Sequence, residues 1–426
     1  MASILDVSHF LESNGFEYDD RVCLYVNSKT GLPVTLFFDR EDGRLFLLDQ
    51  CKLPYEVTFW STDDWYEAAV KGIKGMIVRG SQAIGVAGAY CLALACVKLN
   101  GLDLDEALKT LFMRGDIIKS VRPTAVNLSW AINRIFNKIK SWEISSLEDL
   151  KMNVLDEADR IFIEDFILNK NLRMNGSKLF ESGDVVLTHC NAGSLATSYG
   201  GSALSILSEA FLEGKHLTVV AKETRPRSQG FKLTLWELNR IGIPTVAITD
   251  NMISKSIEQF NISKILVGAD RITKDGCVAN KIGTCDIARI AYMEKIPFYV
   301  AASHSTLDLD REYTEIPIEE RDKDEVRALY EYEIKYMRDK GLLSERAFDK
   351  WPPDDKLTDS NQPSNFKIKI YNPAFDVTPS NYIRKIILDI GVYHPKRIKL
   401  LNWSLVDEKI NRILGNQLDK IHRFQI

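Results

Sequence analysis

Five short apolar runs rich in β-branched residues recur along the second half of the chain, and helix-length intervals separate them. The runs span 185–188, 217–222, 244–249, 265–269 and 297–302. Short apolar runs without polar alternation are typical of parallel strands buried on both faces, and helices connect such strands. We therefore predict an α/β fold, with a Rossmann-like parallel sheet and helices on both of its faces.

Polar residues follow each of these runs directly. The first run ends in Thr188-His189-Cys190-Asn191, and the fourth ends at Asp270. In open α/β sheets, ligands bind beyond the carboxyl ends of the strands. The glycine- and alanine-rich residues after Cys190 predict a helix whose N-terminus would favour a thiolate. At Asp250 and Ser303, which follow two other runs, ordinary capping is the simpler interpretation.

Composition excludes several functional classes. The chain has 426 residues, 45% of them hydrophobic and 27% charged, which is typical of a globular protein with two domains. The formal net charge of −4 offers no basic face for nucleic acid. We expect no membrane contact, because no segment approaches the roughly 20 uncharged apolar residues of a membrane helix. The acidic N-terminus does not resemble a secretory signal, so we expect a cytoplasmic protein, also nuclear in a eukaryote.

The seven cysteines are scattered without the paired spacing of a zinc site. We therefore expect free thiols and no metal. Cys91 and Cys96 lie in an alanine-rich helical stretch, where a cysteine usually serves as a small buried hydrophobic residue.

The first part of the chain predicts a smaller N-terminal domain, residues 1–145. Apolar runs between Val22 and Gln50 alternate with the turn sequences NSKTG and DREDG, which predicts a short antiparallel β-meander. An amphipathic helix is expected near 62–74, and further helices follow. A charged helical connector begins near Ser146 and leads into the sheet domain, which we place at 146–426.

Two segments of the sheet domain differ from the rest in composition. Residues 323–366 begin with a charged helix (325–340) and continue into a stretch rich in proline and aspartate, so we interpret them as an insertion or a mobile loop. The sheet domain is expected to resume at 368–376. Residues 395–426 form a helical extension, because apolar residues recur at helical intervals between Leu405 and Ile421.

Two arginines precede predicted helices in the N-terminal domain. Arg79-Gly80 lies directly before a helix rich in glycine and alanine, and Arg122 lies just before Pro123 at the start of another. A cation beside a helix N-terminus can hold a phosphate group. Taken alone, the small residues indicate close helix packing and Arg122 indicates a surface salt bridge, so both interpretations stay open at this point.

Taken together, these segments resemble one family, the methylthioribose-1-phosphate isomerases. This family shares its fold with the alpha, beta and delta subunits of the exchange factor for the eukaryotic initiation factor. The resemblance runs from about residue 47 to about residue 390, and the matching segments are LLDQCKLPYE, VRGSQAIGVAGAY, RPTAVNLSWA, VVLTHCNAGSLAT, ETRPRSQGFKLTLWEL, ITDNM, VGADRITKDGCVANKIGT, IPIEER and YNPAFDVTP.

The resemblance implies an aldose-ketose isomerase of methionine salvage that converts 5-methylthioribose 1-phosphate into 5-methylthioribulose 1-phosphate. It implies no metal and no cofactor, and a homodimer whose sheet domain lacks the dinucleotide fingerprint. The catalytic residues of the family fall on Cys190 and Asp270. Its substrate-binding positions fall on Arg79, Gly80, Ser81, Arg122, Gln229, Asn280 and Lys281.

The chemistry explains why such residues are needed. A sugar with phosphate on its anomeric oxygen cannot open until its ring oxygen is protonated, and Asp270 is a plausible acid because burial raises a carboxyl pKa. Arg271 would oppose this effect, so we expect it to point away. Cys190 either takes a proton as a base or stabilises a hydride transfer. The arginines and Lys281 would hold the phosphate, while Gln229 and Asn280 would bond sugar hydroxyls.

The chain departs from the family pattern at three positions. Ser81-Gln82 stands where Ala-Pro is common, and Ser303 stands where a proline is expected. These polar residues leave two related substrates open, 5-deoxyribose 1-phosphate and ribose 1,5-bisphosphate. An alternative of another class is a non-catalytic regulatory subunit of a translation initiation exchange factor.

Overall fold

A seven-stranded sheet forms the centre of the second half of the chain. The computed structural model describes residues 7–123, 125–342 and 370–423. The strand order is β16-β15-β12-β9-β6-β7-β8, and all neighbours are parallel except β15 and β16. The five predicted strands are confirmed, and the bounds of the seven are β6 (Val185–Thr188), β7 (Thr218–Lys222), β8 (Thr245–Ile248), β9 (Lys264–Val267), β12 (Phe298–Ala302), β15 (Lys385–Leu388) and β16 (Gly391–Tyr393).

Helices cover both faces of this sheet, as predicted. Successive side chains of a strand point to opposite faces. Accordingly, Ile386 packs in a core with α9 (Ile253–Phe260) and α10 (Thr284–Met293), whereas its neighbour Ile387 packs in a second core with α7 (Ala203–Leu212) and α8 (Leu235–Ile241). Burial on both faces explains why the strands consist of continuous apolar runs.

A smaller sheet of four strands lies beside the main one, in the order β13-β10-β11-β14. Its last strand shows how the sheet domain resumes near 368–376: the chain enters this smaller sheet and not the main one. Residues 368 and 369 lie outside the described residues, and Phe375–Thr378 form β14, which pairs antiparallel with β11. The main sheet resumes only at β15. The other bounds are β10 (Arg271–Thr273), β11 (Val278–Lys281) and β13 (Leu307–Asp308).

The antiparallel strands predicted between Val22 and Gln50 are present, but they do not form one continuous meander. The strand β2 pairs with an earlier strand, β1, and β3 and β4 form a separate sheet with the later strand β5. Instead of one amphipathic helix near 62–74, β5 ends at Thr62 and a short α2 leads into a π-helix. The bounds are α1 (Val7–Ser13), β1 (Phe16–Asp19), β2 (Leu24–Asn27), β3 (Leu36–Asp39), β4 (Arg44–Leu48), β5 (Phe59–Thr62), α2 (Trp65–Glu67) and η1 (Ala68–Lys74).

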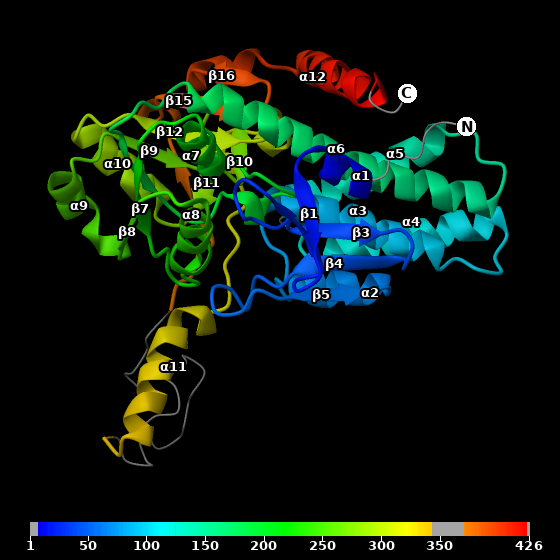
Figure 1. The fold of residues 1–426 in the computed structure, drawn as a ribbon, viewed down its shortest axis with the longest axis horizontal. Helices are drawn as coiled ribbons and strands as arrows, with labels where there is room; N and C mark the ends of the chain where they lie inside the picture. Colours follow the sequence, from blue (N-terminus) through cyan, green and yellow to red (C-terminus); the bar gives the residue numbers. More distant parts are fainter. Residues whose placement is uncertain (1–6, 124, 343–369, 424–426) are drawn as a thin grey trace.

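Four long helices complete the N-terminal part: α3 (Ser81–Val97), α4 (Leu104–Ser120), α5 (Val126–Ser141) and α6 (Leu147–Ser177). The predicted connector is α6, which runs from this part to the sheet (Figure 1). Its residues up to Leu168 pack in the N-terminal core, and Leu172 packs against the sheet. One rigid helix therefore joins the two parts, and the division at 145/146 stays a proposal.

The two C-terminal helices predicted from the sequence are confirmed. The charged helix is α11 (Asp324–Asp339), which projects away from the rest of the molecule (Figure 1), and the final helix is α12 (Trp403–Arg423). The remainder of the predicted insertion, from 343 onward, lies outside the described residues. Within those residues, none of the helices combines the length and apolarity that a bilayer crossing requires.

We predict that Gly115→Ala destabilises the protein. Gly115 lies in α4, and an added Cβ would lie 2.2 Å from Cζ of Phe136 on α5. Overpacking of this kind costs about 1–3 kcal/mol, which exceeds the gain of about 1 kcal/mol in helix propensity. Urea unfolding measures the difference. The matched control is Gly415→Ala in α12, where nothing lies within 4 Å of the added atom, so that variant should be at least as stable as the parent.

Candidate active site

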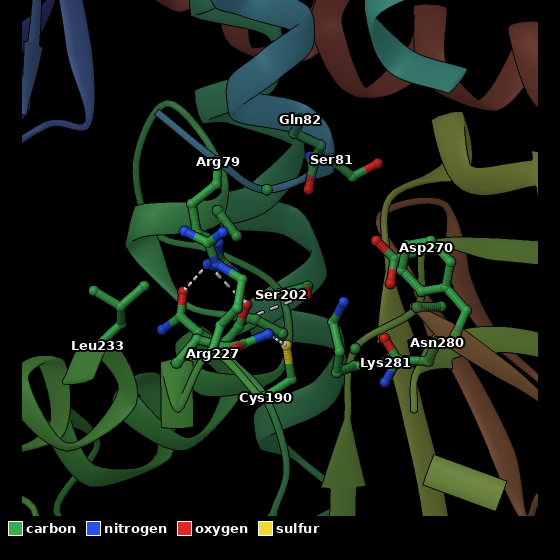
Figure 2. Close-up of a pocket in the computed structure, with 18 of the residues that line it drawn as sticks. Arg79, Ser81, Gln82, Cys190, Ser202, Arg227, Leu233, Asp270, Asn280 and Lys281 are labelled. Atoms are coloured by element: carbon green, nitrogen blue, oxygen red, sulfur yellow. Dashed lines mark hydrogen bonds between the residues drawn. The ribbon is translucent and has the colours of Figure 1, made fainter. Parts of the chain in front are cut away.

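A cavity of about 230 Å³ opens where the carboxyl ends of the central strands meet the N-terminal helices. We call it the chamber. All nine site residues predicted from the sequence line it, although they come from six separate places in the chain. The nine residues are Arg79, Gly80, Ser81, Arg122, Cys190, Gln229, Asp270, Asn280 and Lys281. Figure 2 labels six of them, Arg79, Ser81, Cys190, Asp270, Asn280 and Lys281.

Cys190 lies two residues after the end of β6 and adopts a left-handed backbone conformation with φ of 64°. The amide of Gln229 donates to its thiol, with 3.6 Å between Nε2 and Sγ. The helix predicted after Cys190 is absent: a loop leads to a 3-10 turn, η2 (Ser194–Ala196), and α7 begins only at Ala203. The thiol therefore does not lie at a helix N-terminus, and Gln229 is its observed hydrogen-bond partner.

Asp270 lies between β9 and β10 on the opposite side of the chamber from Cys190 (Figure 2). Burial raises the pKa of its carboxyl group above 3.8, and the nearby cations Lys281, Arg79 and Arg122 lower that pKa in part. Arg271 points away, as predicted, because its guanidinium pairs with Asp308 at 2.6 Å. The arrangement therefore leaves Asp270 more easily protonated than an exposed carboxyl group.

Lys281 at the end of β11 extends between Cys190 and Asp270 (Figure 2). Burial lowers the pKa of its ammonium group, while the charges of Cys190 and Asp270 raise that pKa. Its Nζ also lies over the ring of Phe375, 4.6 Å from the centroid. The preceding Asn280 is buried and donates to the hydroxyl of Thr284 at 3.1 Å. The small sheet therefore brings a cation and an amide to the chamber.

Arg79 is held in place by the residue that follows Cys190. Its guanidinium donates to Oδ1 of Asn191 at 2.5 Å and to the carbonyl oxygen of Asn191 at 2.7 Å. The amide nitrogen of Asn191 in turn donates to the buried carboxylate of Glu237 at 2.8 Å. Because its partner is a neutral amide, Arg79 keeps its full positive charge beside the chamber.

Gly80 shows why glycine is needed between Arg79 and α3. Its φ of +102° is rarely accessible to other residues, and a Cβ here would lie 2.4 Å from Cα of Ala196. The close approach brings the start of α3 against the loop that carries Cys190. The start of α3 lines the chamber, and free backbone N–H groups at a helix start can bind an anion.

Three buried polar atoms of the chamber have no hydrogen-bond partner among the described residues. They are Nη1 of Arg122, Oε1 of Gln229 and Oε1 of Gln50. Burial lowers the pKa of Arg122, and no carboxylate among the described residues forms an ion pair with it in compensation. Native proteins rarely leave such groups unpaired. A ligand with an anionic group and hydroxyl groups would satisfy them.

Sequence reasoning missed two arginines of the chamber, Arg227 and Arg321. Both pair with Glu325 at the start of α11, at 2.8 and 2.6 Å. These ion pairs join the loop that carries Gln229 to the segment that leads into α11. The ETRPRSQG and IPIEER motifs contain both residues, but only the fold shows that they converge.

The residues that depart from the family pattern form hydrogen bonds with other residues of the protein. The amide of Gln82 donates to Asp165 and Asn169 on α6, at 2.8 and 3.0 Å, and Ser81 accepts from Asn127 at 2.7 Å. Ser303 caps a 3-10 turn and donates to Asp389 at 3.0 Å. Asp250 likewise accepts from backbone N–H groups of Thr224 and Arg225. Capping is therefore confirmed for Ser303, whereas the carboxylate of Asp250 does not cap a helix but binds the loop after β7.

All seven cysteines are free thiols, as predicted, and Cys91 and Cys96 are buried in α3. Among the residues that the structure describes, no three His, Cys, Asp or Glu side chains are grouped as a metal site would require.

Comparison with known proteins agrees with the resemblance found in the sequence. Residues 77–395 match the Initiation factor 2 subunit family. The methylthioribose-1-phosphate isomerase of Carboxydothermus hydrogenoformans is 41% identical over 357 residues, which cover 83% of this chain and 94% of that protein. The chain belongs to the methylthioribose-1-phosphate isomerase family.

Solved structures agree with this assignment. The 5-methylthioribose 1-phosphate isomerase from Pyrococcus horikoshii matches with a TM-score of 0.73 and 32% identity, over 90% of this chain and 96% of that one. A structure described as translation initiation factor eIF-2B, subunit delta, from A. fulgidus matches with a TM-score of 0.69 and 36% identity, over 90% and 99%. Similar chains are thus described both as isomerases and as initiation factor subunits. The residues of the chamber have to decide which of the two functions fits this chain.

We predict that Glu237→Gln lowers the free energy of unfolding by about 1–3 kcal/mol, the cost of an unmet buried polar group. The carboxylate accepts from the amide of Asn191 and from the backbone N–H groups of Ser194 and Leu195, and a glutamine would turn an NH₂ group against one of these donors. Urea unfolding tests this. Glu258→Gln, an exposed carboxylate on α9, is the control, and equal stability of both variants would contradict the prediction.

Proposed function

We propose that this chain isomerises 5-methylthioribose 1-phosphate to 5-methylthioribulose 1-phosphate, in methionine salvage, with the chamber as its active site. One observation carries the proposal: a thiol and a carboxyl group with a raised pKa lie on opposite sides of a cation-lined cavity. The names of the 41% identical relative and of the Pyrococcus structure support the choice of substrate.

The phosphate is the first group to be placed. Arg79, Arg122 and Lys281 line the chamber, and no carboxylate of the described residues forms an ion pair with any of them, whereas Arg227 and Arg321 are partly neutralised by Glu325. We assign the dianion to the first three, together with the backbone at Gly80 and Ser81. Gln229 and Asn280 then bond the sugar hydroxyls. Holding the sugar at both ends orients its reacting carbons between Cys190 and Asp270.

Ring opening is the first chemical step. Protonated Asp270 donates its proton to the ring oxygen, and the bond from that oxygen to C1 breaks. The phosphate oxygen supplies electron density to C1 as this happens. A hydrogen then moves from C2 to C1, the C2 hydroxyl becomes the ketone, and the proton that this hydroxyl loses returns to the Asp270 carboxylate and restores the acid. In the proton route the Cys190 thiolate accepts this hydrogen as H⁺, and in the hydride route Cys190 stabilises the charge that develops.

The two routes are separated by running the reaction in D₂O. Solvent deuterium at C1 of the product identifies the proton route, because a thiol exchanges with water before it returns the proton. Complete retention of the original hydrogen identifies direct hydride transfer.

We predict that Cys190→Ser and Asp270→Asn each abolish measurable turnover of methylthioribose 1-phosphate and leave the fold intact. Cys190 is only partly buried, and each replacement has nearly the size of the residue that it replaces, so neither change opens a large cavity. Ketose formation measures turnover, and circular dichroism measures folding. Cys23→Ser is a matched control because that thiol does not line the chamber. Unaltered rates in either site variant would refute the role of that residue.

We predict that kcat/KM falls as the pH rises through the pKa of Asp270, because only the protonated acid can open the ring. The midpoint lies above the ordinary value of 3.8, since burial raises this pKa. A raised pKa also means that the stability contributed by protonated Asp270 is fully present below pH 3.8 and is lost as the pH rises through the raised pKa. The stability of Asp270→Asn relative to the parent should therefore increase over the same interval. A melting-temperature difference that does not change with pH would contradict this.

Two related substrates are compared in the same assay, 5-deoxyribose 1-phosphate and ribose 1,5-bisphosphate. The polar groups that suggested them, Ser81 and Gln82, are engaged with Asn127 and α6, which favours the methylthio sugar. Faster turnover of either alternative would replace our first choice.

The alternative of another class is a regulatory subunit of an initiation factor exchange complex, which the description of the A. fulgidus structure favours. Such a subunit has no need of a thiol and a carboxyl group facing one cavity. Absence of turnover with all three sugars, in a protein that is folded, would favour the regulatory function.

A homodimer and a cytoplasmic location belong to the same proposal. Light scattering of the purified chain tests the first, and cell fractionation tests the second.

A further inference from the structure

The backbone of Cys190 is held on both sides by threonine hydroxyl groups. Its N–H donates to Oγ1 of Thr224 at 2.9 Å, and its carbonyl oxygen accepts from Oγ1 of Thr234 at 2.6 Å. Both threonines are completely buried, and they come from the loop after β7 and from the π-helix η3 (Gly230–Thr234). The two contacts therefore fix the orientation of the two peptide groups that flank the reactive thiol.

These contacts act on an unfavourable backbone conformation. Cys190 has a φ of 64°, in the left-handed region that residues with a Cβ seldom adopt, and Thr224 itself has a φ of 65°. Such conformations persist only where the surroundings impose them. The direction of the Cα–Cβ bond, and with it the position of Sγ, depends on this conformation. Loss of either hydroxyl would let the backbone relax and turn the thiol away from the chamber.

The hydroxyl of Thr224 is itself oriented by its neighbours. Nε2 of His189 lies 2.9 Å from the carbonyl oxygen of Ile282, so this nitrogen carries the hydrogen and donates. Burial lowers the pKa of His189 to about 3, which leaves the ring neutral and Nδ1 free to accept. Thr224 lies 3.3 Å from Nδ1 and 3.3 Å from the carbonyl of Lys222. Both can only accept, so the single hydrogen of the hydroxyl points toward these two acceptors and its oxygen is available to the N–H of Cys190.

The second threonine connects Cys190 to the proposed phosphate site. Thr234 also accepts from Nδ2 of Asn191 at 3.3 Å, and Asn191 holds the guanidinium of Arg79. His189 similarly reaches Ile282, the residue that follows Lys281. The network thus fixes the thiol relative to the groups that would hold the substrate.

We propose that Thr224 and Thr234 are positioning residues that aim the Cys190 thiol at the substrate. The inference rests on the proposed isomerase function, and neither hydroxyl lines the chamber or touches the substrate. Their contribution is to the geometry of the hydrogen-transfer step, so it should affect kcat more than KM.

The test compares Thr224→Val and Thr234→Val with Thr224→Ser and Thr234→Ser in the full chain. Valine keeps the shape and removes the hydroxyl, whereas serine keeps the hydroxyl and removes the methyl group. Misplacement of a reacting group by about 1 Å costs on the order of 10²-fold in rate. We expect kcat for methylthioribose 1-phosphate to fall by about this factor in the valine variants, with KM little changed, and to recover in the serine variants. The control is Thr245→Val on β8, whose hydroxyl bonds the carbonyl of Ile243 away from the chamber.

A second measurement does not depend on turnover. Iodoacetamide alkylation, followed by mass spectrometry of the peptides, reports the accessibility and orientation of each thiol. The ratio of Cys190 to Cys51 alkylation should change in the valine variants and return to the parent value in the serine variants, because Cys51 bonds the carbonyl groups of Gly75 and Met76 instead.

Each outcome decides between the two proposals. Valine variants with the kcat and alkylation ratio of the parent would overturn the positioning role, as would serine variants that fail to recover. If a valine variant does not fold, the corresponding alanine variant replaces it in the same comparison. If the parent protein turns over none of the sugars, the proposed function fails, and the alkylation ratio alone still decides whether the threonines hold the thiol.

Discussion

The buried carboxylate of Glu237 is the contact on which the geometry of the chamber depends. It accepts from the amide of Asn191 and from the backbone N–H groups of Ser194 and Leu195. Burial raises its pKa, and these donors lower it in part. A buried polar group without partners is costly, so the loop must stay wrapped around it. Gly193 has no side chain for the same reason, since a Cβ would lie 2.2 Å from Oε2. Cys190 and Arg79 both take their positions from this loop.

Several residues beside the chamber have strained backbone conformations. Cys190, Thr224 and Ser228 all have positive φ values between 55° and 65°, and each such residue costs on the order of 1–3 kcal/mol. The strained residues lie at the ends of two neighbouring strands, β6 and β7. The rigid sheet holds these ends in register, and Asp250 accepts from the N–H groups of Thr224 and Arg225. Three of the positive-φ residues therefore lie in the two loops around the reactive thiol, while others, such as Asn261 and Lys295, lie elsewhere in the chain.

The sequence predicted the sheet well because apolar runs record burial on both faces. Cys190, Gln229 and Asp270 converge because the loops after strands of a parallel sheet share one edge, whereas the other site residues reach the chamber from helices and from the small sheet. The sequence failed where long-range contacts decide the structure. The residues after Cys190 were expected to form a helix, but they are rich in glycine and serine, and the carboxylate of Glu237 binds the N–H groups of Ser194 and Leu195. Likewise β2 pairs with β1, and Phe375–Thr378 pair with β11. No pattern in one segment can identify such partners. Arg227 and Arg321 were missed because they are distant from each other in sequence, and only the fold brings both to Glu325.

The positive charges of the chamber would favour phosphate binding but disfavour the protonated form of Asp270. Arg79, Arg122 and Lys281 attract the dianion, but the same cations lower the pKa of Asp270 and so weaken it as a proton donor. Under the proposed function, the substrate itself resolves this conflict. Its phosphate would neutralise the cations and exclude water, and both effects raise a carboxyl pKa. The pKa of Asp270 would then be higher with the sugar bound than in the empty chamber. Asp270 would therefore be protonated when the sugar is in place. Under the proposed function, the burial of Asp270 and the unpaired charge of Arg79 thus act together. The phosphate of the bound substrate balances the positive charge of the chamber, and Asp270 can then hold its proton.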